Sequence, residues 1–214
     1  MDAEFDAVCS LLGGEAGVRG GNEFRVMRSG IGKVNAASRC TEFILRESPD
    51  CIISSGCAGG LDPSVGLLDA VVSDECCYHD VWCGEPNAPG QVQGMPQRFI
   101  CDRRLCNLAV SAAKGMRVHT GPVCSGDRFC TDPREIDAIR TLLPDALAID
   151  MESCALAQVC YMYGVPFVSV RIISDTVAAE GKDRIAQYKD FWSDVAGKSF
   201  AVLESLICTM PHSL

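Results

Sequence analysis

The clearest pattern of hydrophobic and polar positions lies between residues 146 and 176. A short apolar run, Ala146–Ile149, comes first, and a run rich in β-branched residues, Phe167–Ile173, comes last. Between these runs, apolar residues recur at the spacing of one helical face, at Ala155, Val159, Met162 and Tyr163. The pattern predicts a strand, a helix and a strand, which together form a parallel crossover unit.

Acidic residues follow both predicted strands. Asp150 and Glu152 come after the first strand, and Asp175 comes after the second. Ligands of open parallel sheets bind at the carboxyl ends of strands, so these carboxylates are expected to face one crevice. Local pattern alone leaves a second interpretation open, in which Glu152 interacts with free N–H groups at a helix start and Asp175 caps a turn.

The remaining pattern predicts further strands and helices in a single α/β domain spanning residues 1–214. Strands are expected at Glu23–Arg28, Asp50–Ser55, Asp69–Glu75 and Val118–Cys124. Helices are expected at Ala3–Leu12, Val34–Glu47, Asp102–Lys114, Pro133–Leu143 and Ile185–Cys208. A reduced hairpin is expected around Gly20-Gly21-Asn22, and a long irregular loop over residues 81–99.

Composition narrows the class of protein. The chain has 214 residues, of which 48% are hydrophobic, and a net charge of −9 without any basic cluster, which argues against a nucleic-acid partner. Its apolar runs are shorter than the roughly 20 residues that span a bilayer, and its N-terminus does not resemble a signal peptide. We therefore expect a cytoplasmic protein that does not bind membranes.

The chain contains 14 cysteines but no CxxC pair. Most stand among apolar residues, where a thiol acts as a small buried hydrophobe. The densest group is Cys76, Cys77, His79 and Cys83. Neighbouring residues of a strand point to opposite faces, so Cys76 and Cys77 are not expected to bind one ion, and we predict no metal site. His79 is interpreted as structural.

Three sequence motifs suggest a family. They are Met151-Glu152, Gly164-Val165-Pro166-Phe167 and Arg171-x-x-Ser174-Asp175. Together they closely resemble the signature of the nucleoside phosphorylase and hydrolase superfamily, in particular of its methylthioadenosine/S-adenosylhomocysteine nucleosidases. The resemblance covers nearly all of the chain and thins at residues 4–29 and 176–188. It implies a three-layer α/β/α sandwich with a central mixed β-sheet, and no cofactor.

The same resemblance implies roles for particular residues. Met1-Asp2-Ala3-Glu4 matches the family's spacing from a methionine to the catalytic base, which would be Glu4. Asp175 would donate a proton to purine N7, while Glu152 would accept hydrogen bonds from the ribose hydroxyls. Met151 would pack under the sugar.

Aromatic residues and glycine loops complete the implied site. Phe129 would stack on the purine, the backbone of Cys130 would bind the purine edge, and Tyr188 would supply a second aromatic ring. The other residues implied to contact the substrate are Ile31, Cys57, Ala58, Gly59 and Ser174.

The turn at residues 29–35 is glycine-rich and follows a predicted strand. Such a turn can bind an anion through its N–H groups, or it can be a plain tight turn. Because no arginine stands within this turn or near the second glycine loop, residues 56–61, we expect water rather than phosphate as the nucleophile.

The N-terminus departs from the family pattern, because this sequence starts where the family's first strand ends. The fold is therefore expected to lack that strand, and we expect an apolar strand upstream that ends at Met1. The loop at residues 81–99 is implied to lie at a homodimer contact and to shape the neighbour's pocket for the 5′-substituent.

The expected reaction is hydrolysis of the N-glycosidic bond of methylthioadenosine or S-adenosylhomocysteine to adenine and a 5′-thioribose. Three alternatives stay open. A purine nucleoside phosphorylase would use phosphate, and a futalosine-type hydrolase would differ in its 5′ pocket. A non-catalytic storage protein with the same fold would carry no activity.

Overall fold

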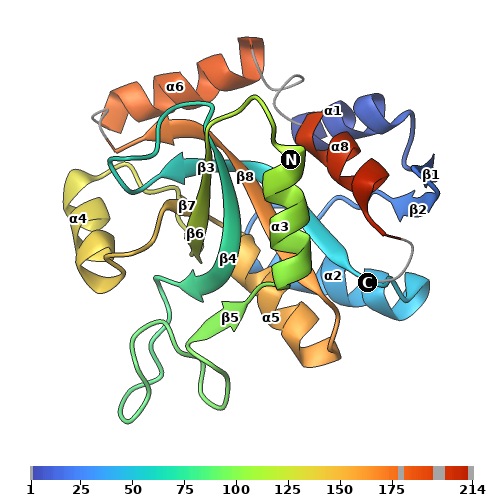
Figure 1. Ribbon diagram of the computed structural model, residues 1–214. Helices are drawn as coiled ribbons and strands as arrows, with labels where there is room; N and C mark the ends of the chain where they lie inside the picture. Colours follow the sequence, from blue (N-terminus) through green and yellow to red (C-terminus); the bar gives the residue numbers. More distant parts are fainter. Residues whose placement is uncertain (1, 178–180, 195–200, 212–214) are drawn as a thin grey trace.

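The computed structural model describes residues 2–177, 181–194 and 201–211 (Figure 1). The helices are α1 (Asp2–Leu12), α2 (Lys33–Glu47), α3 (Arg103–Ala112), α4 (Pro133–Leu142), α5 (Ser153–Tyr163), α6 (Gly181–Asp194) and α8 (Ala201–Thr209). The strands are β1 (Ala16–Arg19), β2 (Asn22–Arg25), β3 (Ile52–Gly60), β4 (Ala70–Tyr78), β5 (Arg98–Ile100), β6 (Val118–Ser125), β7 (Ala148–Asp150) and β8 (Phe167–Thr176). Within these residues, no helix combines the length and apolar character needed to cross a bilayer.

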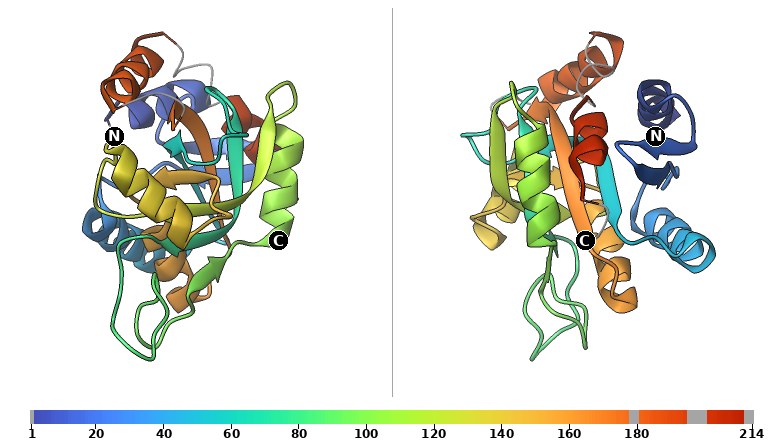
Figure 2. Two further views of the ribbon diagram at one scale, coloured as in Figure 1. Left: turned by 90° about the vertical axis from the view of Figure 1, so that its left-hand side faces the viewer. Right: turned by 45° about the vertical axis from the view of Figure 1, so that its right-hand side comes forward.

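The central sheet is mixed, as predicted, and it curls into a ring. β3 pairs with β8, β8 with β4, β4 with β6, β6 with β7, and β7 returns to β3. All five strands of the ring contribute to one buried cluster, which consists of Ala58, Val65, Val71, Val123, Ala148 and Ile173. Helices cover both sides of the sheet, with α4 on one side and α3, α5 and α8 on the other (Figure 2).

The predicted parallel crossover is wrong in its pairing. β7 and β8 do not pair with each other, because β3 lies between them, antiparallel to β7 and parallel to β8. An irregularity at Ala58 and Gly59 bends β3, and only Gly59 and Gly60 then reach β7. The expected order of strand, helix and strand is nevertheless confirmed.

Three other predictions need correction. Met162 and Tyr163 are exposed, because the last turn of α5 extends beyond the sheet that covers Ala155. The strand expected at residues 23–28 ends at Arg25, where its short hairpin with β1 ends. The C-terminal helix is divided among the described residues into α6, which packs on β8, and α8, which packs on α3 and α1 (Figure 1). Val195 and Phe200, expected on the apolar face of that helix, lie outside the described residues.

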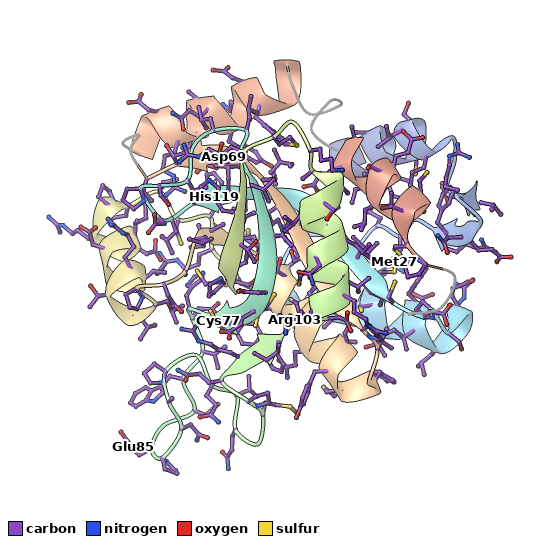
Figure 3. The ribbon with its side chains drawn as sticks, viewed as in Figure 1. Met27, Asp69, Cys77, Glu85, Arg103 and His119 are labelled. Atoms are coloured by element: carbon purple, nitrogen blue, oxygen red, sulfur yellow. The ribbon has the colours of Figure 1, made fainter. Side chains whose placement is uncertain are left out.

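The cysteines are free thiols, and most of them are buried. Cys76 and Cys77 point to opposite faces of β4, as predicted, because they belong to separate core clusters. Cys77 is labelled in Figure 3, which also shows Glu85 at the tip of the projecting loop. In the same view Asp69 lies beside His119, and the His119 Nε2 and Asp69 Oδ2 atoms are 2.7 Å apart. This pair connects the residue before β4 to β6.

One edge of β3 has no neighbouring strand along residues 52–57 in the described part of the chain. The N–H of Ile52 donates to Pro166 on the β8 side, so strand alternation turns the backbone groups of Ile53 and Ser55 toward the opposite edge. A groove of about 850 Å³ lies there. It is lined by β3 and by residues of α1, β2, α2 and α8. In the right-hand view of Figure 2, α1 and β2 lie apart from the central sheet, whereas α8 lies next to α3.

Candidate active site

The carboxyl end of β8 holds two buried polar residues, Ser174 and Asp175. The Ser174 hydroxyl lies 2.9 Å from Asp175 Oδ1 and 3.3 Å from the carbonyl oxygen of Ala58. Asp175 is 1% exposed, and its Oδ2 atom accepts hydrogen bonds from the Arg184 guanidinium. A strand buried on both faces thus fixes this carboxyl group at the edge of a cavity.

Asp150, at the end of β7, stabilises the start of α5. Its carboxylate accepts hydrogen bonds from the backbone N–H groups of Glu152 and Ser153. It also pairs with Arg171, whose Nε atom is 2.7 Å from Asp150 Oδ2. The capping role that the local pattern allowed for Glu152 is therefore performed by Asp150, and the Glu152 side chain makes no cap hydrogen bond.

Glu152 instead reaches the glycine turn before α2. Its Oε1 atom accepts a 2.8 Å hydrogen bond from the N–H of Gly32. Burial and, to a lesser extent, the negative charges of Asp150 and Glu4 together raise the pKa of Glu152 to about 7, although the Gly32 hydrogen bond and the Arg171 charge lower it. Glu152 therefore changes its protonation state near neutral pH.

The N-terminus of α2 is satisfied by carboxylates from other parts of the chain. Gly32 donates to Glu152, and the N–H of Lys33 donates to Asp127 Oδ1 over 2.7 Å. The Lys33 side chain pairs with Asp80, which also accepts the N–H of Asp127. The anion that this turn was predicted to attract is thus supplied by the protein itself.

Glu4 lies in the first turn of α1, which confirms the predicted helix start. Its Oε1 atom accepts a 3.1 Å hydrogen bond from the N–H of Cys57 and lies 3.6 Å from the Cys57 thiol. A Cβ atom on Gly56 would stand 3.0 Å from the same oxygen, so Gly56 lets the carboxylate approach β3 closely. Glu4 also lines the groove beside the open edge of β3.

Arg171 lies beneath these acids, fully buried in β8. Its guanidinium donates to Asp150, to the Ser54 hydroxyl over 2.9 Å and to the carbonyl oxygen of Val170. The negative charges of Asp150, Glu152 and Glu4 all raise the pKa of Arg171, although burial alone would lower it. The sequence has no arginine close to the second glycine loop, residues 56–61, but folding brings Arg171 beside Gly56.

A small cavity lies between the end of β8 and the loop that follows β6. Phe129, Cys130, Met151 and Asp175 line it, as does Gly59 of the bent end of β3. The Phe129 ring is half exposed, and its centre lies 5.5 Å from that of Tyr188 in an edge-to-face contact. The residues expected to hold the purine are therefore brought together.

The remaining residues predicted to contact the substrate belong to β3 and to the glycine turn before α2. Cys57 and Ala58 continue β3 from the Glu4 side toward Gly59, while Ile31 is exposed in the glycine turn. His79 lies apart from them, packed so closely on Gly126 that a Cβ atom there would stand 2.3 Å from its ring. In the described residues, no group of three or more His, Cys, Asp or Glu side chains is arranged to hold a metal ion.

Sequence reasoning overlooked several residues. Asp150 and Arg171 stood inside the recognised motifs, so the buried pair could have been anticipated from a carboxylate and an arginine on two buried strands. Asp127 followed a glycine in the loop before Phe129, which gave no indication of its contact with α2. Arg184 stood just before the predicted start of a helix, and nothing in its local sequence indicated that it enters the cavity.

Comparison with known proteins agrees with the family that the sequence motifs suggest. The model of the phosphorylase superfamily matches residues 7–207. The 5′-methylthioadenosine/S-adenosylhomocysteine nucleosidase of Anoxybacillus flavithermus is 38% identical over 205 residues, which are 94% of this chain and 86% of that protein.

Two solved structures superpose on nearly the whole chain. The 5′-methylthioadenosine/S-adenosylhomocysteine nucleosidase of Neisseria meningitidis, in complex with methylthio-immucillin-A, has a TM-score of 0.89 and 31% identity over 98% of this chain and 96% of its own. The corresponding enzyme of Colwellia psychrerythraea, in complex with adenine, has a TM-score of 0.91 and 27% identity over 100% of this chain and 94% of its own.

Proposed function

Because the chain belongs to the phosphorylase superfamily and, within it, to the family of 5′-methylthioadenosine/S-adenosylhomocysteine nucleosidases, we propose that it hydrolyses the N-glycosidic bond of these nucleosides. Water adds to the ribose carbon, and the products are adenine and the corresponding 5′-thioribose. Cleavage develops positive charge on the ribose and negative charge on the purine. The site therefore needs an acid at the base and a carboxylate with water at the sugar.

Asp175 is the proposed acid. Its carboxyl group lies in the cavity that Phe129 and Cys130 line, and the relative from C. psychrerythraea binds adenine. Ser174 holds Oδ1 by a hydrogen bond, which leaves Oδ2 facing the cavity. Protonated Asp175 gives its proton to purine N7 as the glycosidic bond breaks.

Glu4 is the proposed base. Its carboxylate is held by Cys57, near Arg171 and Glu152. Ionised Glu4 removes a proton from the attacking water, and Glu152 accepts hydrogen bonds from the ribose hydroxyls. Met151, which lines the purine cavity next to Glu152, packs under the sugar. Ile31, Ala58 and Tyr188 complete the contacts.

The observation that favours water over phosphate is the occupied N-terminus of α2. Gly32 and Lys33 already donate to the carboxylates of Glu152 and Asp127, so a phosphate ion would have to displace two anions. Arg171 is engaged by Asp150, Ser54 and Val170. A phosphorylase needs cationic groups available for phosphate, whereas this arrangement presents carboxylates.

Release of adenine from methylthioadenosine, measured with and without phosphate, tests the proposal. We expect the same rate in both conditions and the free 5-methylthioribose as product. A rate that depends on phosphate, with a sugar phosphate as product, would assign the chain to the phosphorylases. The absence of cleavage under both conditions would favour a non-catalytic protein with this fold.

We also propose that the chain forms a homodimer through the loop at residues 81–99 and the adjoining surface. Trp82, Ile100, Tyr161 and Met162 are exposed there, and Tyr161 contacts Phe99 edge to face. Large apolar side chains gathered on one surface are typical of an interface. We expect a dimer by light scattering, and we expect the Ile100→Asp variant to be a monomer. A monomeric wild type would contradict this assembly.

A further inference from the structure

The guanidinium of Arg184 lies where the proposed function places the purine. Arg184 comes from the first turns of α6, and its side chain is 2% exposed. Its Nε and Nη2 atoms lie 2.7 Å and 2.6 Å from Asp175 Oδ2, the oxygen that faces the cavity. Arg184 therefore binds the group that would donate the proton to the base.

Arg184 also fills the space around that oxygen. The cavity bounded by Phe129, Met151 and Arg184 has a volume of about 40 Å³. Pockets that hold small ligands usually measure about 300–1,000 Å³. A Cβ atom on Gly59 would stand only 2.4 Å from Arg184 Nη2, so the guanidinium fits against bare backbone. A purine cannot enter this cavity while Arg184 remains in place.

The Arg184 guanidinium is not fully satisfied in this position. Its Nη1 atom is buried and has no hydrogen-bond partner among the described residues. A buried donor without a partner costs free energy, so the pair with Asp175 is less favourable than its two short contacts suggest. An imperfectly satisfied pair can be separated by a competing ligand more readily than a complete one.

The position of Arg184 near the start of α6 allows its side chain to withdraw from the cavity. The neighbouring side chains of Asp183 and Ile185 are exposed, so Arg184 is the side chain of this turn that enters the protein. One turn later, Tyr188 contacts Phe129 at the mouth of the cavity. A shift confined to this first part of α6 would withdraw Arg184 while Phe191, later in the helix, stays in the core.

We propose that Arg184 is a plug that the nucleobase must displace, which makes it a determinant of affinity for the purine. The inference rests on the proposed function, since it takes the ligand to be an adenine nucleoside. The planar guanidinium occupies the place of the planar base and holds Asp175 Oδ2 until the base arrives. Once Arg184 withdraws, Oδ2 is available to purine N7.

Calorimetric binding of free adenine tests this inference without requiring turnover. We expect the Arg184→Ala variant to bind adenine at least about tenfold more tightly than the wild type, because no guanidinium has to be displaced. The KM for methylthioadenosine should fall in the same direction. Lys189→Ala removes an exposed cation from the same helix and should leave adenine binding within about twofold of the wild type.

Unchanged or weaker adenine binding by a folded Arg184→Ala variant would contradict the proposal that Arg184 must be displaced by the nucleobase. A large loss of kcat with unchanged KM would also overturn it, because Arg184 would then assist the reaction itself. If Arg184→Ala fails to fold, Arg184→Gln, which keeps a planar group without the charge, replaces it with the same expected direction. A wild type that binds adenine without cleaving methylthioadenosine would contradict the proposed reaction. The ratio of the adenine affinities of Arg184→Ala and the wild type would still test whether Arg184 blocks the purine site.

Discussion

The two ends of β3 differ in how they hold the proposed catalytic groups. At its carboxyl end, Gly59 and Gly60 pair with both β7 and β8, and Asp175 is fixed inside a closed ring of strands. Nearer its amino end, Ile53 and Ser55 face a groove of about 850 Å³, and Glu4 reaches the N–H of Cys57, two residues before Gly59, from a helix that lines this groove.

The difference has a physical consequence. The acid is positioned by the sheet itself, through backbone pairing and a buried core. The base is positioned by a short helix and by contacts with Cys57, whose N–H donates to it. We therefore expect the purine side of the site to be rigid and the water side to depend on how firmly α1 packs.

The largest effect is expected from Asp175→Asn. An amide cannot supply the proton that purine N7 acquires, and general acid catalysis is typically worth about 10²–10⁴-fold. Initial rates of adenine release measure the loss. Wild-type turnover in this variant would remove Asp175 from the mechanism.

Stability must be separated from chemistry in that experiment, because Asp175→Asn leaves the buried Arg184 charge without its carboxylate. Removing one partner of a buried pair typically costs about 3–5 kcal/mol. The double variant Asp175→Asn/Arg184→Met removes the orphaned charge as well. We expect it to melt at a higher temperature than the single variant and to be equally inactive.

Glu4→Gln tests the other end of β3. The amide oxygen can still accept the N–H of Cys57, but it cannot take a proton from water, so we expect a loss of kcat of about 10²–10⁴-fold. The melting temperature should stay closer to that of the wild type than in Asp175→Asn, because Arg171 keeps its hydrogen bonds to Asp150 and Ser54. Retained activity would show that water is activated elsewhere.

Glu152→Gln is expected to have a smaller effect, mainly on ribose recognition. Hydrogen bonds to charged groups contribute about 1.5–3 kcal/mol, which corresponds to roughly 10- to 150-fold in kcat/KM. A 2′-deoxy substrate should lose little more in this variant than it already loses in the wild type. Full additivity of the two losses would place Glu152 outside the ribose site.

Because the pKa of Glu152 is raised, we expect both the stability of the protein and its KM to depend on pH. The folded protein keeps a proton on Glu152 up to about pH 7, whereas the ordinary pKa of a glutamate is 4.5. The contribution of this proton to stability is therefore present below about pH 4.5 and is lost as the pH rises to 7. Melting temperatures should show this decline in the wild type and a flatter profile in Glu152→Gln. KM should fall as Glu152 ionises, and a KM independent of pH would contradict its role.

The groove beside β3 offers a smaller and purely structural test. A variant extended ahead of Met1 by an apolar strand would pair with Ile53 and Ser55, and each satisfied buried group contributes about 1–3 kcal/mol. Because 1 kcal/mol shifts the melting temperature by roughly 2–4 °C in a chain of this size, we expect an increase of several degrees. An extension with prolines at alternate positions cannot pair and serves as the control. Equal melting temperatures would show that the open edge needs no partner.

The sequence predicted local features better than distant pairings. The starts of α1, α2, α3 and α4 were predicted to within one residue, and in the structure the side chains of Asp102 and Asp132 cap α3 and α4. The pairing of β7 with β3 did not follow, because the bend at Gly59 depends on the closure of the whole sheet. The length of α6 and the exposure of Tyr163 likewise depend on where the sheet ends.

The same limit applies to the site. The resemblance identified Phe129, Cys130, Met151 and Asp175, and folding brings them to one cavity. The sequence could not show that Asp150, rather than Glu152, caps α5, since both acids lie within three residues of Ser153. Nor could it show Arg184 inside the cavity, because that contact depends on how α6 lies over β8.

The division of acid and base between the two ends of β3 can be tested most directly with an activated substrate. A 4-nitrophenyl 5-methylthioriboside carries a leaving group that departs without protonation, so it needs the water side of the site and not the acid. Asp175→Asn should hydrolyse this substrate at close to the wild-type rate, while Glu4→Gln should remain inactive. Equal loss in both variants, or rescue of Glu4→Gln alone, would contradict the account.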